Sequence, residues 1–454
     1  MLKMWIGKDS FMRFFPLILL SFFILGCVHT ELPFDNIKIS FAEKKQTIVR
    51  ENLPAPEVPV VEEKPIEKQP ELEKIKPEEK KEIAVLPPVQ ENKVTIHEIQ
   101  GIPDEVQGKM LLAKGNYTVE KKITVPKGST LILSPGTILT FQECGIVCQG
   151  EIQAKGTASE PIVFQGADGW DNITILGEGA FGVFHHCEIK DGLGMEVQMQ
   201  KDKQCLLEKG GTFQGGAVLI ANKARGEMVD CTIQKNFSQS AIALIYAQAF
   251  SLKDCRILQN DENGVLSIET PCEISDSTFS ENRKVGLFLE GVSKSTIKSS
   301  IFSQNRAGIL VRENANPTIE LNRIFGNVVG MEYQTTSSGI LRENILERNQ
   351  LCGILCIEES KPTLEKNKIE QNSIGILIKN NASPSIQQNT LRFNIEIALL
   401  MIDACSPTVQ DNQITDSKIA MVLQVSTKAN IQKNQIQNCL HEKQIAPQNA
   451  FDKK

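Results

Sequence analysis

A short asparagine-containing phrase returns at near-constant intervals through the second half of this 454-residue chain. It consists of Asn, any residue, Ile or Leu, two further residues and a second Asn. Clear copies begin at Asn322, Asn344, Asn367 and Asn389. Looser copies end at Asn236, Asn260, Asn282, Asn305, Ser417 and Cys439. Successive endpoints are 22 to 24 residues apart. A period this regular indicates one supersecondary unit that is stacked many times.

Each repeat contains three short apolar segments and no run long enough for a helix. The second Asn is followed by a Gly and an apolar run, as in Gly308-Ile-Leu-Val. A second segment often opens with Pro, as in Pro317-Thr-Ile, and a third carries the Asn phrase. β-branched residues dominate, so the segments are predicted to be strands. Three strands in each repeat make one coil of a parallel β-helix, with coils ~4.8 Å apart. A leucine-rich repeat is the alternative, but its Leu-x-x-Leu-x-Leu spacing is absent.

The first Asn of each phrase is predicted to stack into a column, the Asn ladder. An amide in such a column can bond to its neighbours and to the turn backbone. The predicted ladder consists of Asn322, Asn344, Asn367, Asn389, Asn412 and Asn434. Earlier copies carry Cys187, Cys231 and Cys255 at this position. A small buried thiol can fill the same place, so the column is assigned a structural role.

The chain resembles the right-handed parallel β-helix proteins of the pectin-lyase-like superfamily. The resemblance covers about residues 115–440 and includes Gly115-Asn-Tyr-Thr-Val and Pro161-Ile-Val-Phe. It implies an all-β, right-handed, single-stranded parallel β-helix of about 14 coils over residues 94–440. Such proteins include lyases, hydrolases, epimerases, adhesins and non-catalytic binders. The function must therefore be argued from a site.

The beginning of the chain predicts export. Residues 12–27 combine a cationic start, a short apolar stretch and small residues, which is typical of a secretory signal and too short for a transmembrane helix. The ending Ile24-Leu-Gly-Cys27 resembles a bacterial lipobox, which implies that residues 1–26 are a lipoprotein signal peptide and that Cys27 is lipidated. Val28 follows, so the resemblance implies the outer membrane if the cell is Gram-negative, and otherwise the cell envelope. An ordinary signal peptide with a chance Cys is the alternative.

Three further segments complete the predicted organisation. Residues 27–93 are predicted to be a lipid-anchored flexible linker, because in residues 43–92 eight prolines among Glu and Lys leave too few apolar residues to bury. Residues 94–440 are the β-helix, and residues 441–454 are a polar C-terminal tail. Residues 193–213 break the period, which favours a loop, with a degenerate coil as the alternative.

Charge and cysteine usage exclude several functions. The net charge is −6 and no basic stripe with aromatic neighbours occurs, so no nucleic-acid partner is predicted. After Cys27 the cysteines fall mostly at core or ladder positions, where a thiol acts as a small apolar side chain. The spacing of Cys144 and Cys148 on a strand is poor for metal chelation. No metal and no cofactor are predicted.

The strand after the Gly is predicted to be apolar on both faces. If the residue after the Gly points inward, as the resemblance implies, the next residue points outward. The outward residues form a predicted partner-binding apolar stripe: Leu266, Phe288, Leu310, Leu355, Leu377 and Leu399. A parallel sheet of this kind normally has something packed on each face. The chain itself (residues 193–213 or 94–112), a second copy, another envelope protein or a lipid-like ligand could cover the stripe.

Catalysis is weakly supported by the sequence. The same strand offers only Arg312, Glu290 and Glu332, whereas β-helix hydrolases use clustered carboxylates. Neighbours of opposite sign on adjacent coils more often form an ion pair. The resulting prediction is a non-catalytic, membrane-anchored envelope protein that presents a surface to a protein, to itself or to a polysaccharide. The alternatives are a polysaccharide lyase or hydrolase and, by resemblance to periplasmic β-helix proteins, an accessory factor for metalloenzyme maturation.

Overall fold

The computed structural model describes residues 96–166, 168–200, 203–207, 213–448 and 450, which contain 46 strands, β1 to β46. The predicted signal peptide (1–26), Cys27 and the predicted linker (27–93) lie outside the described residues. Within the described ranges, no helix is long and apolar enough to cross a membrane.

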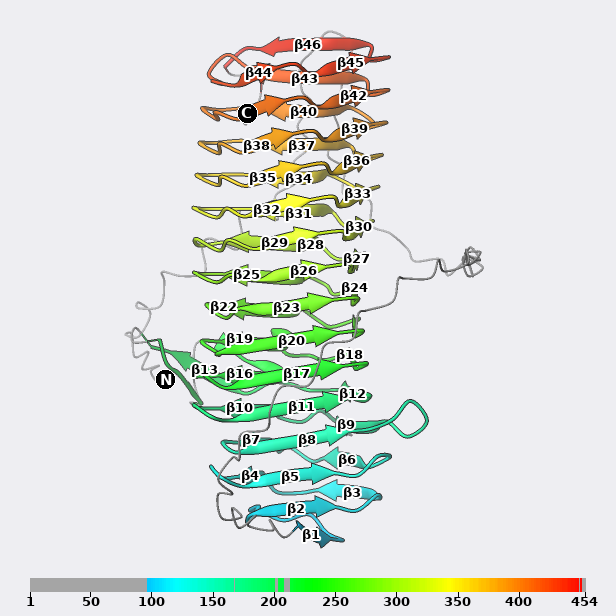
Figure 1. The fold of residues 1–454 in the computed structure, drawn as a ribbon, viewed down its shortest axis with the longest axis vertical. Coiled ribbons are helices and arrows are strands. Elements are labelled where there is room, and N and C mark those ends of the chain that lie inside the picture. Colours follow the sequence, from blue (N-terminus) through cyan, green and yellow to red (C-terminus); the bar gives the residue numbers. More distant parts are fainter. Residues whose placement is uncertain (1–95, 167, 201–202, 208–212, 449, 451–454) are drawn as a thin grey trace, which may run out of the picture. The chain divides into compact units, whose positions relative to one another are not determined.

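Three long parallel sheets contain all but three of the described strands (Figure 1). Sheet I consists, from one end to the other, of β1 (Ile96–Ile99), β2 (Lys109–Leu112), β5 (Thr130–Leu133), β8 (Glu151–Lys155), β11 (Phe181–His185), β17 (Arg225–Val229), β20 (Ala249–Lys253), β23 (Cys272–Ser275), β26 (Thr296–Lys298), β29 (Thr318–Glu320), β32 (Ile340–Arg342), β35 (Thr363–Glu365), β38 (Ser385–Gln387), β41 (Thr408–Gln410) and β44 (Asn430–Gln432).

Sheet II carries the apolar strands that follow the repeated Gly. It consists of β4 (Ile123–Val125), β7 (Ile146–Cys148), β10 (Ile173–Leu176), β16 (Gly216–Ala221), β19 (Ser240–Ile245), β22 (Asn263–Ile268), β25 (Val285–Glu290), β28 (Ala307–Arg312), β31 (Val329–Tyr333), β34 (Cys352–Cys356), β37 (Ile374–Ile378), β40 (Ile397–Met401), β43 (Ile419–Gln424) and β46 (His441–Ala446).

Sheet III carries the strands of the Asn phrase. It consists of β3 (Asn116–Val119), β6 (Ile138–Phe141), β9 (Ile162–Gly166), β12 (Cys187–Lys190), β18 (Thr232–Gln234), β21 (Arg256–Leu258), β24 (Thr278–Ser280), β27 (Ile301–Ser303), β30 (Arg323–Phe325), β33 (Ile345–Glu347), β36 (Lys368–Glu370), β39 (Thr390–Arg392), β42 (Gln413–Thr415) and β45 (Gln435–Gln437). Each coil passes through sheets II, I and III in turn, which confirms the predicted all-β parallel β-helix of about 14 coils.

The coils turn sharply at residues with left-handed backbone. Leu321 and Glu343 have φ of 59° and 56°, and each directly precedes a ladder Asn. This conformation is unfavourable for residues other than Gly, so the turn needs compensating bonds. Asn344 supplies them, because its Nδ2 donates to the carbonyls of Ile319 and Arg342, both at 2.9 Å. The ladder side chain thus stabilises the turn of its own coil through Arg342 and bonds to β29 of the coil below through Ile319.

The same side chains join successive coils. Nδ2 of each ladder Asn donates to Oδ1 of the next at 2.9 to 3.1 Å along the column Asn322, Asn344, Asn367, Asn389, Asn412 and Asn434. Below Asn322 the column continues through Ser300, Ser277, Cys255 and Cys231. A second column of this kind contains Asn236, Asn260, Asn282, Asn305, Asn327, Asn349, Asn372 and Asn394. Two columns of buried amides therefore hold the coils in register.

Two segments differ from a plain stack of coils. Residues 193–213 do not form a coil in sheets I to III, because β10 pairs directly with β16 across them. They contribute to sheet IV, an antiparallel sheet of β13 (Glu196–Met199), β14 (Cys205–Leu207) and β15 (Phe213–Gln214). The assignment of 441–454 entirely to a tail was wrong, because β46 pairs with β43. A terminal coil has no further coil to cover it and carries a polar surface, and β46 is mostly exposed, so its polar sequence resembled a tail.

Candidate functional site

The predicted apolar stripe lies on the outer face of sheet II. Its column reads, in register, Leu266, Phe288, Leu310, Glu332, Leu355 and Leu377. The residue before each of these belongs instead to the buried core, as Leu287, Ile309 and Ile354 do. Five of the six predicted residues therefore share one column on neighbouring coils.

The prediction for Leu399 was wrong. Leu377 pairs with Leu400, whereas Leu399 pairs with Ile376 and belongs to the core. In this coil Ala398 occupies the position that Gly holds in most coils. Without the Gly as a reference, the alignment of the repeat slipped by one residue, and one residue reverses the direction of a strand side chain.

A second outward column makes this face wider than the sequence analysis predicted. It consists of Val285, Ala307, Val329, Cys352, Ile374, Ile397 and Ile419. Val285 and Ala307 pack with Leu310 and Phe288 in a cluster separate from the main core. The signal was present in the sequence, because an apolar residue directly precedes the Gly in several repeats. The outer face is therefore two apolar side chains wide.

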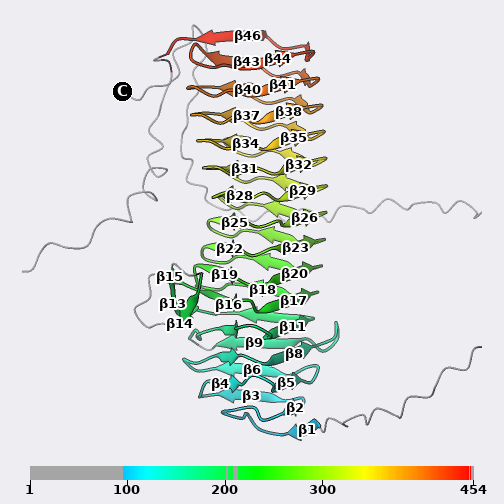
Figure 2. The same cartoon turned by 60° about the vertical axis from the view of Figure 1, so that its left-hand side comes forward.

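Sheet IV covers the lower part of this face, where Figure 2 shows β13 to β15 beside β16 and β19. Val197 and Cys205 of sheet IV pack with Leu219 and Ala243 of sheet II. Asn222 fastens the insert, since its Nδ2 donates to the Cys205 carbonyl and its Oδ1 accepts from the Cys205 amide, both at 2.8 Å. The insert is thus part of the packed structure.

The middle of the face is also shielded from solvent. We define the middle face as Val329, Glu332, Cys352, Leu355, Ile374 and Leu377. Leu355 and Leu377 are half-buried and the other four are buried. By contrast, Lys368 on the outer face of sheet III is exposed. Apart from sheet IV, every described strand belongs to sheets I to III, so no described strand lies over the middle face.

The upper end of the face has a partial cover of its own. Pro447 and Gln448 follow β46, and Gln424 of β43 donates a hydrogen bond to the Gln448 carbonyl. Leu400 and Val422 are buried near this end. The middle face therefore lies between two covered regions.

The three candidate catalytic residues do not form one cluster. Arg312 lies beside Glu290 on the neighbouring coil, and its Nε and Nη2 are each 2.8 Å from Glu290 Oε2. The guanidinium also lies over the Phe288 ring, 5.0 Å from its centroid. Glu332 lies in the column of Leu310, two positions along the strand from the column of Arg312. The structure thus brings Arg312 and Glu290 together as an ion pair and places Glu332 among apolar residues.

Glu332 is an unusual member of the middle face. Its carboxylate accepts a hydrogen bond from Gln334 Nε2 at 2.5 Å, yet the residue is only 3% exposed. Burial raises the pKa of Glu332, and the Gln334 bond opposes the shift. A residue that binds or cleaves a substrate has to be accessible, and Glu332 is buried in this structure.

The described cysteines are free thiols, and all except Cys439 are buried. Burial raises the pKa of Cys148 to about 12 and that of Cys405 to about 11, so neither is a ready nucleophile. Among the described residues, no group of three His, Cys, Asp or Glu side chains could hold a metal ion. The thiols therefore serve as small apolar side chains.

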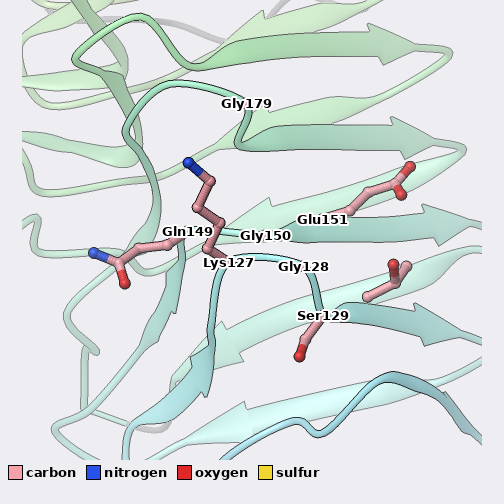
Figure 3. Close-up of a pocket in the computed structure, with 8 residues that line it drawn as sticks. Lys127, Gly128, Ser129, Gln149, Gly150, Glu151 and Gly179 are labelled. Carbon is pink, nitrogen blue, oxygen red and sulfur yellow. The ribbon is translucent and has the colours of Figure 1, made fainter.

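A depression of about 330 Å³ lies at the turns from sheet II to sheet I near β5 and β8 (Figure 3). Its lining residues are Lys127, Gly128, Ser129, Thr130, Gln149, Gly150, Glu151 and Gly179. In Figure 3, Lys127 and Gln149 point away from Glu151. No aromatic ring lines it, so it offers no stacking surface for a sugar. The outer face of sheet II is the stronger candidate.

Comparison with known proteins agrees with the fold. The family model described as "Right handed beta helix region" matches residues 92–289, 240–391 and 352–440. Over 64 residues the chain is 39% identical to Protein bark beetle of Drosophila melanogaster, which is 14% of this chain and 2% of that protein. The chain thus spans a very small part of that relative.

Several solved structures are similar at low identity. The A-module of the mannuronan C-5 epimerase AlgE4 from Azotobacter vinelandii is 13% identical, with 75% of this chain and 89% of that chain covered and a TM-score of 0.43. PfbA, a surface adhesin of Streptococcus pneumoniae, is also 13% identical, with coverages of 75% and 85% and a TM-score of 0.39. At these identities the likeness concerns the fold alone.

Proposed function

This chain belongs to the right-handed beta helix family, and from that premise we propose that it is a non-catalytic binding protein of the cell envelope. In this proposal, acylated Cys27 anchors the chain and the solenoid is presented to a protein or polysaccharide partner. The observation that carries the proposal is that the outer face of sheet II bears two apolar columns. A catalytic role would require a cluster of charged residues there. The fold accommodates many functions, so this site decides between them.

The charged residues on this face argue against glycan cleavage. Glycoside hydrolysis requires two carboxyl groups that face the scissile bond at a set separation. Glu290 is engaged in an ion pair with Arg312, and Glu332 is buried. Trp170 and Tyr333, two of the few rings able to stack on a sugar, are fully buried. A lyase or hydrolase would have to expose and rearrange these groups.

Membrane attachment is supported by the sequence of residues 12–27. The test is metabolic labelling with palmitate in a bacterial host, followed by membrane fractionation. We expect label and membrane attachment in the natural chain and loss of both in Cys27→Ser. Cys439→Ser, which removes a thiol near the other end, is the matched control and should keep both. Label that persists in Cys27→Ser would contradict the anchor.

The binding role is tested on purified chain with Cys27→Ser, so that the proposed lipid anchor cannot hold it on membranes. We expect no depolymerisation of polyuronates, and sedimentation with insoluble cell-wall polysaccharide or with envelope membranes if these carry the partner. Leu355→Asp with Leu377→Asp should abolish that co-sedimentation, while Thr363→Asp on the outer face of sheet I should not. Polyuronate cleavage that disappears in Arg312→Ala would replace the proposal with the lyase alternative.

A further inference from the structure

The middle face needs an occupant, and the described residues do not supply one. Its outward side chains Glu332 and Cys352 are 3% and 0% exposed, although no described strand lies over them. Outward side chains on an uncovered parallel sheet remain open to solvent, and a sheet that is apolar on both faces is normally packed on both. Sheet IV ends below this region, where its contacts are with β16 and β19.

We propose that residues 37–41 of the same chain dock on the middle face. They read Ile-Lys-Ile-Ser-Phe, the alternation of a strand with one apolar and one polar side. Ile37, Ile39 and Phe41 would contact the two apolar columns, and Lys38 and Ser40 would face water. The longest other apolar run of the predicted linker, Ile83-Ala-Val-Leu86, does not alternate with polar residues, so it lacks the one apolar and one polar side of residues 37–41.

The chain is long enough for this contact. The middle face begins at β31 and extends to β37, with β34 the tenth strand of sheet II, so it lies on the order of 50 Å along the stack from the first coil. Residues 42–95 connect the docking segment to β1 and can span on the order of 150 Å when extended. The segment therefore reaches the face without strain.

Docking would also shorten the free part of the linker between the membrane anchor and the β-helix. Nine residues, 28–36, separate Cys27 from Ile37, and they span at most roughly 30 Å. Release of residues 37–41 would restore the full length of linker between Cys27 and β1. This consequence rests on the proposed acylation of Cys27, whereas the docking itself does not. A partner that uses the middle face would have to displace the segment, which couples binding to the distance from the membrane.

The Cys352 thiol can report whether residues 37–41 are docked, because it points outward in the middle face and the docked segment would protect it from alkylation. The experiment follows its alkylation by iodoacetamide in the mature chain with Cys27→Ser, with each site quantified by mass spectrometry. We expect slow reaction in this parent and an increase of about tenfold or more when Ile37, Ile39 and Phe41 are all changed to Asp, because the charged segment no longer docks. Lys38→Asp with Ser40→Asp, on the polar side, should leave the rate unchanged.

A second thiol is needed as a control, because residues next to Cys352 on the sheet could protect Cys352 from alkylation without any docked segment. Leu355→Cys in a Cys352→Ala chain places a thiol at a half-buried position of the same face. The proposal is overturned if the parent reacts fast, or if neither reporter responds to the triple Asp change. Protection that falls on dilution of the parent would identify a second copy as the occupant and overturn it as well. Because Cys27 is absent throughout, a failure of lipidation cannot produce any of these results.

Discussion

Oδ1 of Asn367 accepts two hydrogen bonds from Asn344 of the neighbouring coil, one from the backbone amide at 3.0 Å and one from Nδ2 at 3.1 Å. Both residues are fully buried. One side chain therefore satisfies a buried backbone donor and a buried amide of the coil below. This arrangement, repeated along the column, makes register a property of the side chains as well as of the strands.

Asn367→Ala should lower the free energy of unfolding by about 2 to 4 kcal/mol, because it leaves the buried Asn344 backbone N–H without its acceptor and removes one of the acceptors of Asn344 Nδ2. Urea denaturation followed by circular dichroism measures the change. Asn430→Ala, at an exposed position of β44, is the control and should change stability by less than about 0.5 kcal/mol. Equal effects of the two substitutions would contradict the structural role of the column.

Tyr333→Phe should stabilise the protein by about 1 kcal/mol, because the Tyr333 hydroxyl is buried with no hydrogen-bond partner among the described residues. Tyr117→Phe is the matched control, since the Tyr117 hydroxyl donates to the Ala113 carbonyl at 2.9 Å. It should be neutral or destabilising. Thermal unfolding of both variants tests the contrast, and a loss of stability in Tyr333→Phe would show that the hydroxyl has a partner.

Glu332 should make stability depend on pH. Its pKa is raised in the folded state by burial, so the folded protein holds this proton more tightly than the unfolded chain. The associated stability is fully present below the ordinary pKa of Glu and is lost as the pH rises through the folded-state pKa. Glu332→Gln should remove this loss and raise stability most at neutral pH. Urea midpoints of both proteins at a series of pH values measure it, and parallel curves would contradict the assignment.

Asn222→Ala should loosen sheet IV without unfolding the coils, because both hydrogen bonds between the Asn222 side chain and the Cys205 backbone disappear. The Cys205 thiol, whose pKa is raised to about 11 by burial, should then be alkylated at least about tenfold faster. Asn222 has a φ of 55°, so the control must share the left-handed backbone. Asn380→Ala, with a φ of 61°, should leave Cys205 protected.

The repeat explains how much of the candidate site was predictable. Leu266, Leu310 and Leu355 were placed correctly, because a Gly before each strand marks the start of the alternation. Leu399 was misplaced because Ala398 removes that mark. The column of Val329 and its equivalents was overlooked, although its apolar residues recur with the same period. The pairing of Arg312 with Glu290 and the isolation of Glu332 required the register of the coils.

Periodicity alone therefore specifies the parallel β-helix, its Asn ladder and the apolar character of sheet II, because these depend on local alternation repeated every 22 to 24 residues. The insert at residues 193–213 does not repeat, and nothing in its spacing says where it packs. Its contact with Leu219 and Ala243 exists since β10 and β16 join beneath it and bring distant segments together. Contacts that recur in every coil can be predicted from the sequence period, whereas contacts that occur once depend on which surfaces the folded chain brings together.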